Sequence, residues 1–388
     1  MDNGRNNHNN TDTEPRREYI TRIKEVCGTV RQKIKQFAEY PWREKAKTLA
    51  DYLRNIDYKL LKKQIWRRIK KIRKYTYKVI RKFLRKLSGF PRSLLIGIPT
   101  FVFCYYAVGC LLSENIDVKT EYTLQDKHVP MMETAETMSF LLKREVDDKM
   151  WTPNLPIVFP AYVLDNMPNF QKGTVHAVRD AASILRYFDQ NTDAQKQDIK
   201  KATELLAYPP TIWLMNKKDG FNLAPSSNAQ YRKAAAQLHK FGKDGVFYPK
   251  ARDLSLLLQK IAKHLQKLSI RNENWQLEHD TDWIDTRADD LFYYTRGYAF
   301  AMWQITKTLG ADFKETILAA NLYTEWTYLV NSLKKAAEFS PRIVRNSPPQ
   351  SLFAPNHLLL QNYYILRAVV AAEDINYKIT EAQYADKN

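Results

Sequence analysis

The sequence predicts an all-α protein in which one apolar helix separates a basic helical region from a larger multi-helix domain. Three observations lead to this fold class. Residues 94–112 carry no charge, apolar residues elsewhere recur at helical intervals, and no stretch alternates with the period of two that a strand requires. The chain has 388 residues, of which 44% are hydrophobic and 27% charged, and this composition is typical of a globular protein.

Charge is distributed unevenly along the chain. Residues 1–112 contain 27 Lys and Arg against 9 Asp and Glu, a net charge of +18. Residues 113–388 contain 34 and 33, a net charge of +1. Basic arms of this kind bind nucleic acid or the anionic surface of a membrane, so charge alone leaves both partners open.

The region before the apolar segment is predicted to be a polar tail followed by basic helices. Residues 1–15 contain few apolar side chains, and we expect them to be disordered. Residues 16–89 form the predicted basic helical region, where Ile20, Ile23 and Val26 begin a helical pattern. Residues 62–86 contain thirteen Lys or Arg and no acidic residue.

Within this basic region the apolar residues form one helical stripe. They fall three, four or seven positions apart, at Leu61, Ile65, Ile69, Ile72, Val79, Phe83 and Leu87. A basic amphipathic helix suits the surface of an anionic leaflet, although a solvated helix packed on residues 16–57 is compatible with the same pattern. The residues expected to contact lipid headgroups are Arg67, Lys70, Lys71, Lys74, Lys78, Arg81, Lys82, Arg85, Lys86 and Arg92.

The apolar segment at 94–112, "LLIGIPTFVFCYYAVGCLL", is predicted to be a transmembrane helix. Its nineteen residues include no charge, Asn, Gln or His. At about 1.5 Å per residue they span roughly 28 Å, close to the thickness of the hydrocarbon core of a bilayer. Gly97 and Pro99 are tolerated in such a span, while Tyr105 and Tyr106 lie near its middle rather than at an interface. The alternative is a buried helix of a soluble core, but core helices usually include a polar residue within two turns.

The flanking charges predict the orientation of this helix. The residues before it are mainly basic, whereas Glu114 and Asp117 are the first charged residues after it. Because positive charge stays in the cytoplasm, the N-terminus is expected inside and the C-terminal domain outside. The segment begins too late in the chain for an ordinary cleaved signal peptide, so a single-pass protein with an uncleaved anchor is expected.

Beyond the span we expect a polar connector at 113–130, a helical domain at 131–378 and a flexible tail at 379–388. For the helix predicted at 285–310, Asp285 is a candidate N-cap and Gly310 a candidate C-terminal stop. The spacing of apolar residues predicts helices over 133–148, 173–190, 193–207, 227–242, 251–268, 285–310, 313–339 and 356–374.

Two proline-rich stretches, 151–173 and 339–357, are predicted to be loops. Both retain bulky apolar side chains, so they either cover the ends of the helical bundle or present a partner-binding face. The candidate partner-binding residues in the first stretch are Trp151, Pro153, Asn154, Asn166, Pro168, Asn169 and Phe170.

Three motifs carry a resemblance to a known family. They are "WTPN" followed by "LDNMPNFQ", the helix "RADDLFYYTRGYAFAMW", and the late "LFAPNHLLLQNYYILRA". Over roughly 90–376 the chain resembles the bacterial family known as domain of unknown function 2333. The resemblance implies one membrane span followed by a helical domain in the proteobacterial envelope, and no established activity. The basic extension at 1–89 departs from the family pattern.

No arrangement of residues in the sequence predicts catalysis, a cofactor or a metal site. The densest acidic stretch, "EHDTDWIDTRADD" at 278–290, lacks the glycine and glutamate of a Ca²⁺-binding EF-hand loop, and helix capping explains most of its acids. The three cysteines form no CxxC pair, and neither a GxSxG nor a Walker A motif occurs. The histidines match no zinc-binding spacing; those considered are His176, His239, His264, His279 and His357.

These observations favour a non-enzymatic inner-membrane protein whose periplasmic domain binds a partner. The expected partners are anionic membrane lipids, together with an envelope protein or a second copy of the chain. One alternative is a periplasmic enzyme that acts on the cell wall or another envelope polymer. A second is nucleic-acid binding by the basic N-terminal region, which is not expected.

Overall fold

The structure is a computed structural model. It describes residues 92–123, 132–188, 191–216, 222–243, 249–279, 287–349, 351 and 354–385, together with 66, 70–71, 73–75 and 77–78. The chain forms two compact units, Met1–Leu95 and Ile96–Asn388. In the first unit the described residues are helical. The tail predicted at 1–15 lies outside the described residues, as do Arg67, Arg81, Lys82, Arg85 and Lys86.

Among the residues that the structure describes, one helix, α4 (Arg92–Ser113), is long and apolar enough to cross a membrane, as predicted. Pro99 lies inside this helix and cannot donate a backbone hydrogen bond. The neighbouring hydroxyl of Thr100 donates to the carbonyl of Ile96 at 2.8 Å, one of the ways in which transmembrane helices tolerate proline.

The described part of the chain after α4 is mainly helical, as the sequence predicts. A π-helical turn (Arg144–Asp148) extends the first of these helices, and a 3-10 turn (Pro160–Val163) lies in the first proline-rich stretch. The helices are α5 (Glu133–Lys143), α6 (Asn166–Leu185), α7 (Asp193–Leu206), α8 (Ser227–Lys243), α9 (Ala251–His279), α10 (Ala288–Asp312), α11 (Lys314–Ala319), α12 (Tyr323–Glu338) and α13 (His357–Ala385).

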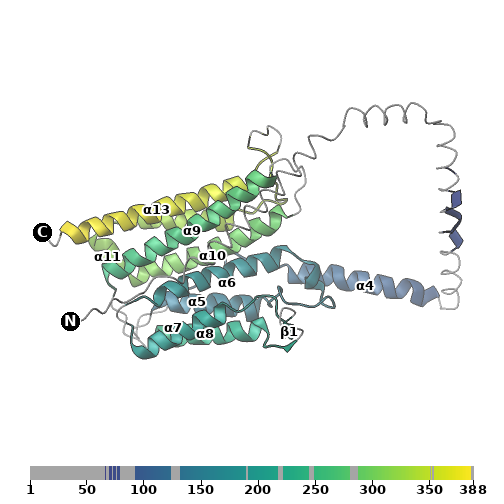
Figure 1. Cartoon of the computed structure of the whole chain (residues 1–388), viewed down its shortest axis with the longest axis horizontal. Helices are drawn as coiled ribbons and strands as arrows, with labels where there is room; N and C mark the ends of the chain where they lie inside the picture. Colours follow the sequence, from purple (N-terminus) through teal and green to yellow (C-terminus); the bar gives the residue numbers. More distant parts are fainter. Residues whose placement is uncertain are drawn as a thin grey trace, which may run out of the picture. The chain divides into compact units, whose positions relative to one another are not determined.

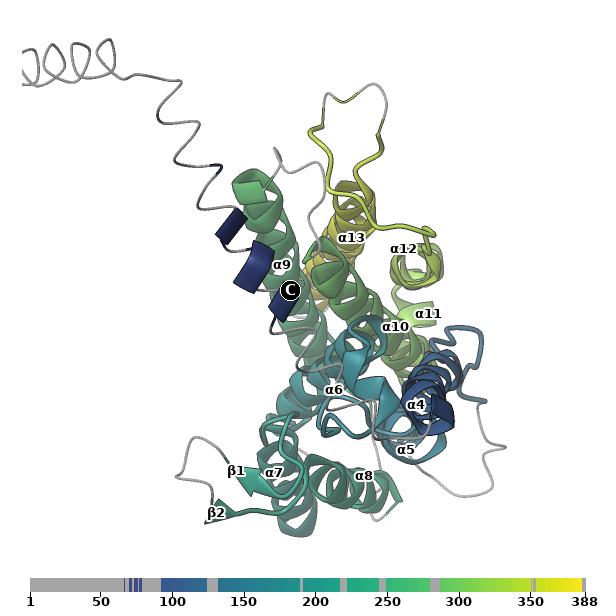
Figure 2. The ribbon, with the colours of Figure 1, turned by 90° about the vertical axis from the view of Figure 1, so that its right-hand side faces the viewer.

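Helices α6 and α10 form the centre of this domain. Helices α5, α7 and α8 lie on one side of the pair, and α9, α12 and α13 lie on the other (Figures 1 and 2). One large cluster of buried apolar residues runs through both groups, and Phe170 of α6 packs on Phe300 of α10 with 5.7 Å between ring centroids. The central pair therefore links two smaller helical layers into one core.

Two glycines let α6 and α10 approach until their backbones touch. A Cβ atom at Gly173 would overlap the carbonyl oxygen of Tyr294, and one at Gly297 would overlap that of Phe170. The hydroxyl of Thr174 lies 3.1 Å from the carbonyl of Phe170 and 3.3 Å from that of Gly297. Only glycine fits at these two crossing points.

The structure corrects several predicted boundaries. Helix α10 continues through Gly310 because this glycine makes room for the indole of Trp326. The helix predicted at 313–339 is divided by Asn321, whose φ of 52° lies in the left-handed region. Helix α13 runs to Ala385 instead of giving way to a flexible tail at 379, and Ile379 is buried.

Two further differences lie near the proline-rich stretches. Helix α6 begins at Asn166 rather than 173, because Pro168 falls in the first turn, where its missing N–H costs nothing. A small antiparallel hairpin joins β1 (Met215–Asn216) to β2 (Asn222–Leu223). Two paired residues per strand are too few to give an alternating pattern, so the hairpin was not predicted.

Replacing either crossing glycine by alanine is expected to destabilise the domain. Alanine gains about 1 kcal/mol of helix propensity over glycine, but steric overlap with the facing backbone costs roughly 1–3 kcal/mol or more. Urea unfolding of the detergent-solubilised chain, followed by tryptophan fluorescence, should give a lower unfolding free energy for Gly173→Ala and Gly297→Ala. The matched control is Gly97→Ala, since an added Cβ there meets nothing within 4 Å. Equal stability of all three variants would contradict the close crossing.

Candidate functional site

The first proline-rich stretch is fixed by buried contacts at its start. The indole of Trp151 is fully buried; it donates to the carbonyl of Pro210 at 2.9 Å and packs edge-on against Tyr231. The amide of Asn154 donates to the carbonyl of Ile212 at 2.9 Å and to Asn228 at 2.6 Å. These contacts tie the stretch to the residues around the hairpin.

Burial changes the role of the residues that we predicted to bind a partner. Trp151, Asn154, Pro168 and Phe170 are buried, so in this fold they position the stretch instead of offering a surface. Pro153, Asn166 and Asn169 are partly exposed. The exposed apolar side chains lie between these groups, and the prediction missed them: Ile157, Val158, Phe159, Tyr162 and Val163.

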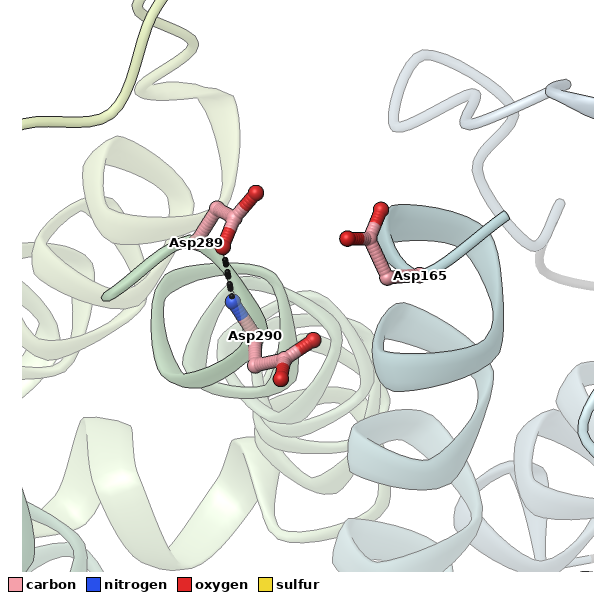
Figure 3. Close-up of side chains that lie close together, drawn as sticks. All are labelled: Asp165, Asp289 and Asp290. Carbon is pink, nitrogen blue, oxygen red and sulfur yellow. Dashed lines mark hydrogen bonds between the residues drawn. The ribbon is translucent and has the colours of Figure 1, made fainter. Parts of the chain in front are cut away.

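A cluster of carboxylates lies where α6 and α10 begin. Asp165 precedes α6, and Asp289 and Asp290 belong to the first turn of α10 (Figure 3). One carboxylate oxygen from each residue lies within 4.8 Å of the others. Asp165 accepts a hydrogen bond from the backbone N–H of Asn166 at 2.9 Å, and Asp289 accepts one from that of Asp290 at 3.0 Å.

Neighbouring groups both oppose and favour the negative charge of this cluster. Burial, followed by the charge of Asp165, raises the pKa of Asp289 above its usual range. The amide of Asn169 donates to Asp290, and Lys172 donates to Asn169 at 3.2 Å. Burial lowers the pKa of Lys172, and Asp290 opposes that shift.

Two physical roles are open to the three carboxylates. Their oxygens are the hard ligands that Ca²⁺ prefers, so they are candidate metal ligands. Acids at helix N-termini also stabilise a helix through its dipole and its unpaired N–H groups, which is the role that the sequence predicted for Asp289 and Asp290. The contribution of Asp165 was not foreseen, because its closeness depends on the crossing of α6 and α10.

A second polar cluster joins α6, α9 and α10. The carboxylate of Asp180 accepts a hydrogen bond from the hydroxyl of Tyr298 at 3.0 Å and lies 3.3 Å from Nδ1 of His264. Burial alone would raise the pKa of Asp180, but the contacts with His264, Arg179 and Tyr298 lower it below its usual range. A pocket of about 270 Å³ lies over this cluster; its basic lining residues are Arg179, His264, Lys267 and Arg271.

The second proline-rich stretch forms one wall of a groove against α13. Its backbone is held by a bridge between Asn346 and Asn356 and by the N–H of Arg345, which donates to His357 at 2.9 Å. The groove encloses about 550 Å³, within the usual range of ligand pockets. Most of its lining is apolar and includes Pro348, Pro349, Pro355, Leu359, Leu360, Tyr363 and Leu366.

Comparison with known proteins adds a family to this geometry. The family model described as "Uncharacterized protein conserved in bacteria (DUF2333)" matches residues 151–274 and 270–381. These ranges include both proline-rich stretches and both polar clusters. No curated protein and no solved structure matches the chain.

The carboxylate cluster can be tested by Asp289→Asn. Asparagine keeps an oxygen for the N–H of Asp290 and removes a charge that burial and Asp165 disfavour. We expect the unfolding free energy at pH 7 to rise by roughly half a kcal/mol, the size of a screened interaction at a partly exposed site.

The matched control is Asp193→Asn, which removes an exposed carboxylate from the first turn of α7. Urea unfolding should show the gain for Asp289→Asn only. If millimolar Ca²⁺ stabilises the natural protein and not the variant, the carboxylates bind a cation and the capping role is insufficient.

A pH dependence is expected from His176, whose Nδ1 lies 2.8 Å from the hydroxyl of Tyr294. Burial, followed by the charge of Arg179, lowers the pKa of His176 from 6.5 to about 4. Between these values the unfolded chain binds the proton more readily, so the unfolding free energy falls as the pH is lowered from 6.5 to 4, by roughly 3 kcal/mol in all. His176→Gln does not titrate and should flatten that part of a pH series of urea unfolding curves; an unchanged slope would exclude His176 as its source.

Proposed function

This chain belongs to the bacterial family of uncharacterized proteins DUF2333, and from that premise we propose that it is a single-pass inner-membrane protein. Its helical domain lies in the periplasm and acts as a non-enzymatic binding or structural module of the cell envelope. The N-terminal basic region lies in the cytoplasm. The partners are anionic lipids on the cytoplasmic side and an envelope protein or a second copy of the chain on the periplasmic side.

Helix α4 is the observation that carries this proposal. Its segment Ile96–Ser113 is apolar, and no residue of it is buried in the described part of the protein. Phe101, Phe103, Leu111 and Leu112 each expose more than two thirds of their surface. A continuous apolar helix of this length suits lipid as its solvent, whereas water would make it a site of aggregation.

Charge on the two sides of α4 supports the orientation. The basic residues lie before the helix, and the first charged residues after it are Glu114 and Asp117. In the first unit, Lys70, Lys71, Lys74 and Lys78 are exposed, in keeping with contact to lipid headgroups at about 1 kcal/mol each.

The apolar groove against α13 supports a binding module over an enzyme. It combines proline rings and leucines with few polar groups, as surfaces for apolar side chains of a partner do. The enzyme alternative rests on the pocket over Asp180 and His264, which is smaller, at about 270 Å³, and is lined by basic residues at four of its eight positions. Nucleic-acid binding by the N-terminal region remains a third alternative, and the closeness of that region to α4 in the sequence favours lipid instead.

Membrane extraction and a topology reporter test the anchor. We expect the chain to stay in the membrane fraction during an alkaline carbonate wash, and a variant without residues 94–112 to be released. Alkaline phosphatase, which is active only outside the cytoplasm, should be active when fused at the C-terminus and inactive when fused at the N-terminus. Release of the intact chain would exclude the anchor, and a silent C-terminal fusion would exclude the orientation.

A further inference from the structure

The polar face of α4 contacts one segment of the domain, residues 156–163, here called the apolar loop. Tyr105, Tyr106, Gly109 and Cys110 fall at i, i+1, i+4 and i+5, and therefore lie on one side of the helix. The hydroxyl of Tyr105 donates to the carbonyl of Val158 at 3.1 Å, and that of Tyr106 donates to the carbonyl of Ile157.

The same face continues toward the end of α4. The thiol of Cys110 lies 3.3 Å from the carbonyl oxygen of Pro160. A Cβ atom at Gly109 would overlap the ring of Pro160, so only glycine lets the loop lie this close. Tyr105 and Tyr106, which lie near the middle of the predicted span, are thus among the residues that hold the loop.

Every carbonyl group from Pro156 to Ala161 has a hydrogen-bond partner. Side chains of α4 supply three of them, for residues 157, 158 and 160. Backbone N–H groups within the loop supply the others: Phe159 donates to Pro156 at 3.0 Å, Tyr162 to Phe159 at 3.0 Å, and Leu164 to Ala161 at 3.2 Å. Irregular backbone is tolerated at membrane depth only when its polar groups are satisfied by protein, and these carbonyls meet that condition.

Four side chains of the apolar loop are more than half exposed. Ile157, Val158 and Val163 are 60–64% exposed, and Tyr162 is 53% exposed. No charged residue occurs between Lys149 and Asp165. The exposed loop residues therefore continue the apolar surface of α4 instead of facing a polar one.

Polar residues mark where both apolar segments end. Glu114 directly follows α4, and Asn166 follows the loop; the amide of Asn166 donates to the carboxylate of Glu114 at 3.1 Å. Tyr106 lies six positions before Leu112, the last apolar residue of α4, which corresponds to a depth of roughly 9 Å. The hydrogen bond of Tyr106 to the carbonyl of Ile157 brings the loop against α4 near this depth.

We propose that the apolar loop enters the outer leaflet of the bilayer beside α4, with acyl chains as the partner of its exposed side chains. The inference rests on the proposed membrane span. The depth read from α4 agrees with the 5–10 Å at which apolar faces of interfacial segments lie. The domain then contacts the membrane through the loop and is also anchored in it by α4.

Accessibility of a nitroxide label measures this depth. The full chain is prepared with Cys27→Ser, Cys104→Ala and Cys110→Ser, the last of which keeps a donor for Pro160. A single cysteine is then introduced as Val158→Cys in the loop, Val108→Cys in α4, or Tyr187→Cys. Tyr187 is exposed and lies two residues beyond Leu185, the last residue of α6, which is about 28 Å along the helix from Asn166.

Each labelled chain is placed in nanodiscs of phosphatidylethanolamine and phosphatidylglycerol and exposed to oxygen or to a water-soluble nickel chelate. We expect the label at 158 to favour oxygen, as at 108, with an apparent depth of about 5–10 Å, whereas the label at 187 favours the chelate. If the label at 158 favours the chelate, like the label at 187, while the label at 108 favours oxygen, the proposed insertion of the loop is wrong and the proposed span is unaffected. If the label at 108 also favours the chelate, the proposed span itself is wrong.

Protection of the label at 158 from both reagents would show that a second copy covers the loop, and would overturn lipid as its partner.

Two matched variants test whether the contact with α4 holds the loop in position. Gly109→Leu should displace the loop and shift the label at 158 toward the chelate, whereas Gly97→Leu, at an open position of the same helix, should not. An unchanged label in Gly109→Leu would overturn the assignment of α4 as the support of the loop.

Discussion

The backbone contact between α6 and α10 at Gly173 and Gly297 is the constraint on which the rest of the domain depends. It fixes the distance and register of the two central helices, and the remaining helices pack on the two sides of this pair. It also brings the starts of α6 and α10 together. The carboxylate cluster of Asp165, Asp289 and Asp290 is a direct result, since neither helix alone carries all three.

The same crossing positions the surface near α4. Gln171, which directly follows Phe170 at the crossing, accepts hydrogen bonds from the backbone N–H and the hydroxyl of Thr152 at 2.9 and 2.8 Å, and donates to the carbonyl of Glu145 at 3.0 Å. After α4 in the chain, the N–H of Tyr122 donates to Gln304 of α10 at 3.1 Å, so the described part of the connector, residues 113–123, contacts the domain. Contacts of described residues therefore connect both the apolar loop and the end of α4 to α6 and α10.

Much of the fold was predictable, because apolar residues at helical spacing mark the buried face of each helix. The predicted starts of α7, α8 and α9 are exact, and the predicted family is confirmed. The failures have a common physical origin. Considered locally, Gly310 predicts the end of a helix and Gly173 the start of one, yet both lie inside helices. The space that a side chain would take is filled by Trp326 at Gly310 and by the backbone of α10 at Gly173. Tertiary contacts of this kind leave no local signal.

The candidate sites show the same limit. The sequence directed attention to Trp151 and Asn154, whose side chains are distinctive and which the fold buries, and away from Ile157 and Val158, which are ordinary in composition and exposed. The signal that could have identified the loop is the absence of charge between Lys149 and Asp165, read together with Tyr105 and Tyr106 in the middle of α4. A hydroxyl inside an apolar helix needs a hydrogen-bond partner, and a proline-rich loop has carbonyls without enough N–H groups to satisfy them. The hydroxyls of α4 thus donate to carbonyls of the loop. This explains why a helix with hydroxyls in its apolar segment and a loop with unpaired carbonyls, each unfavourable alone, are compatible in one structure.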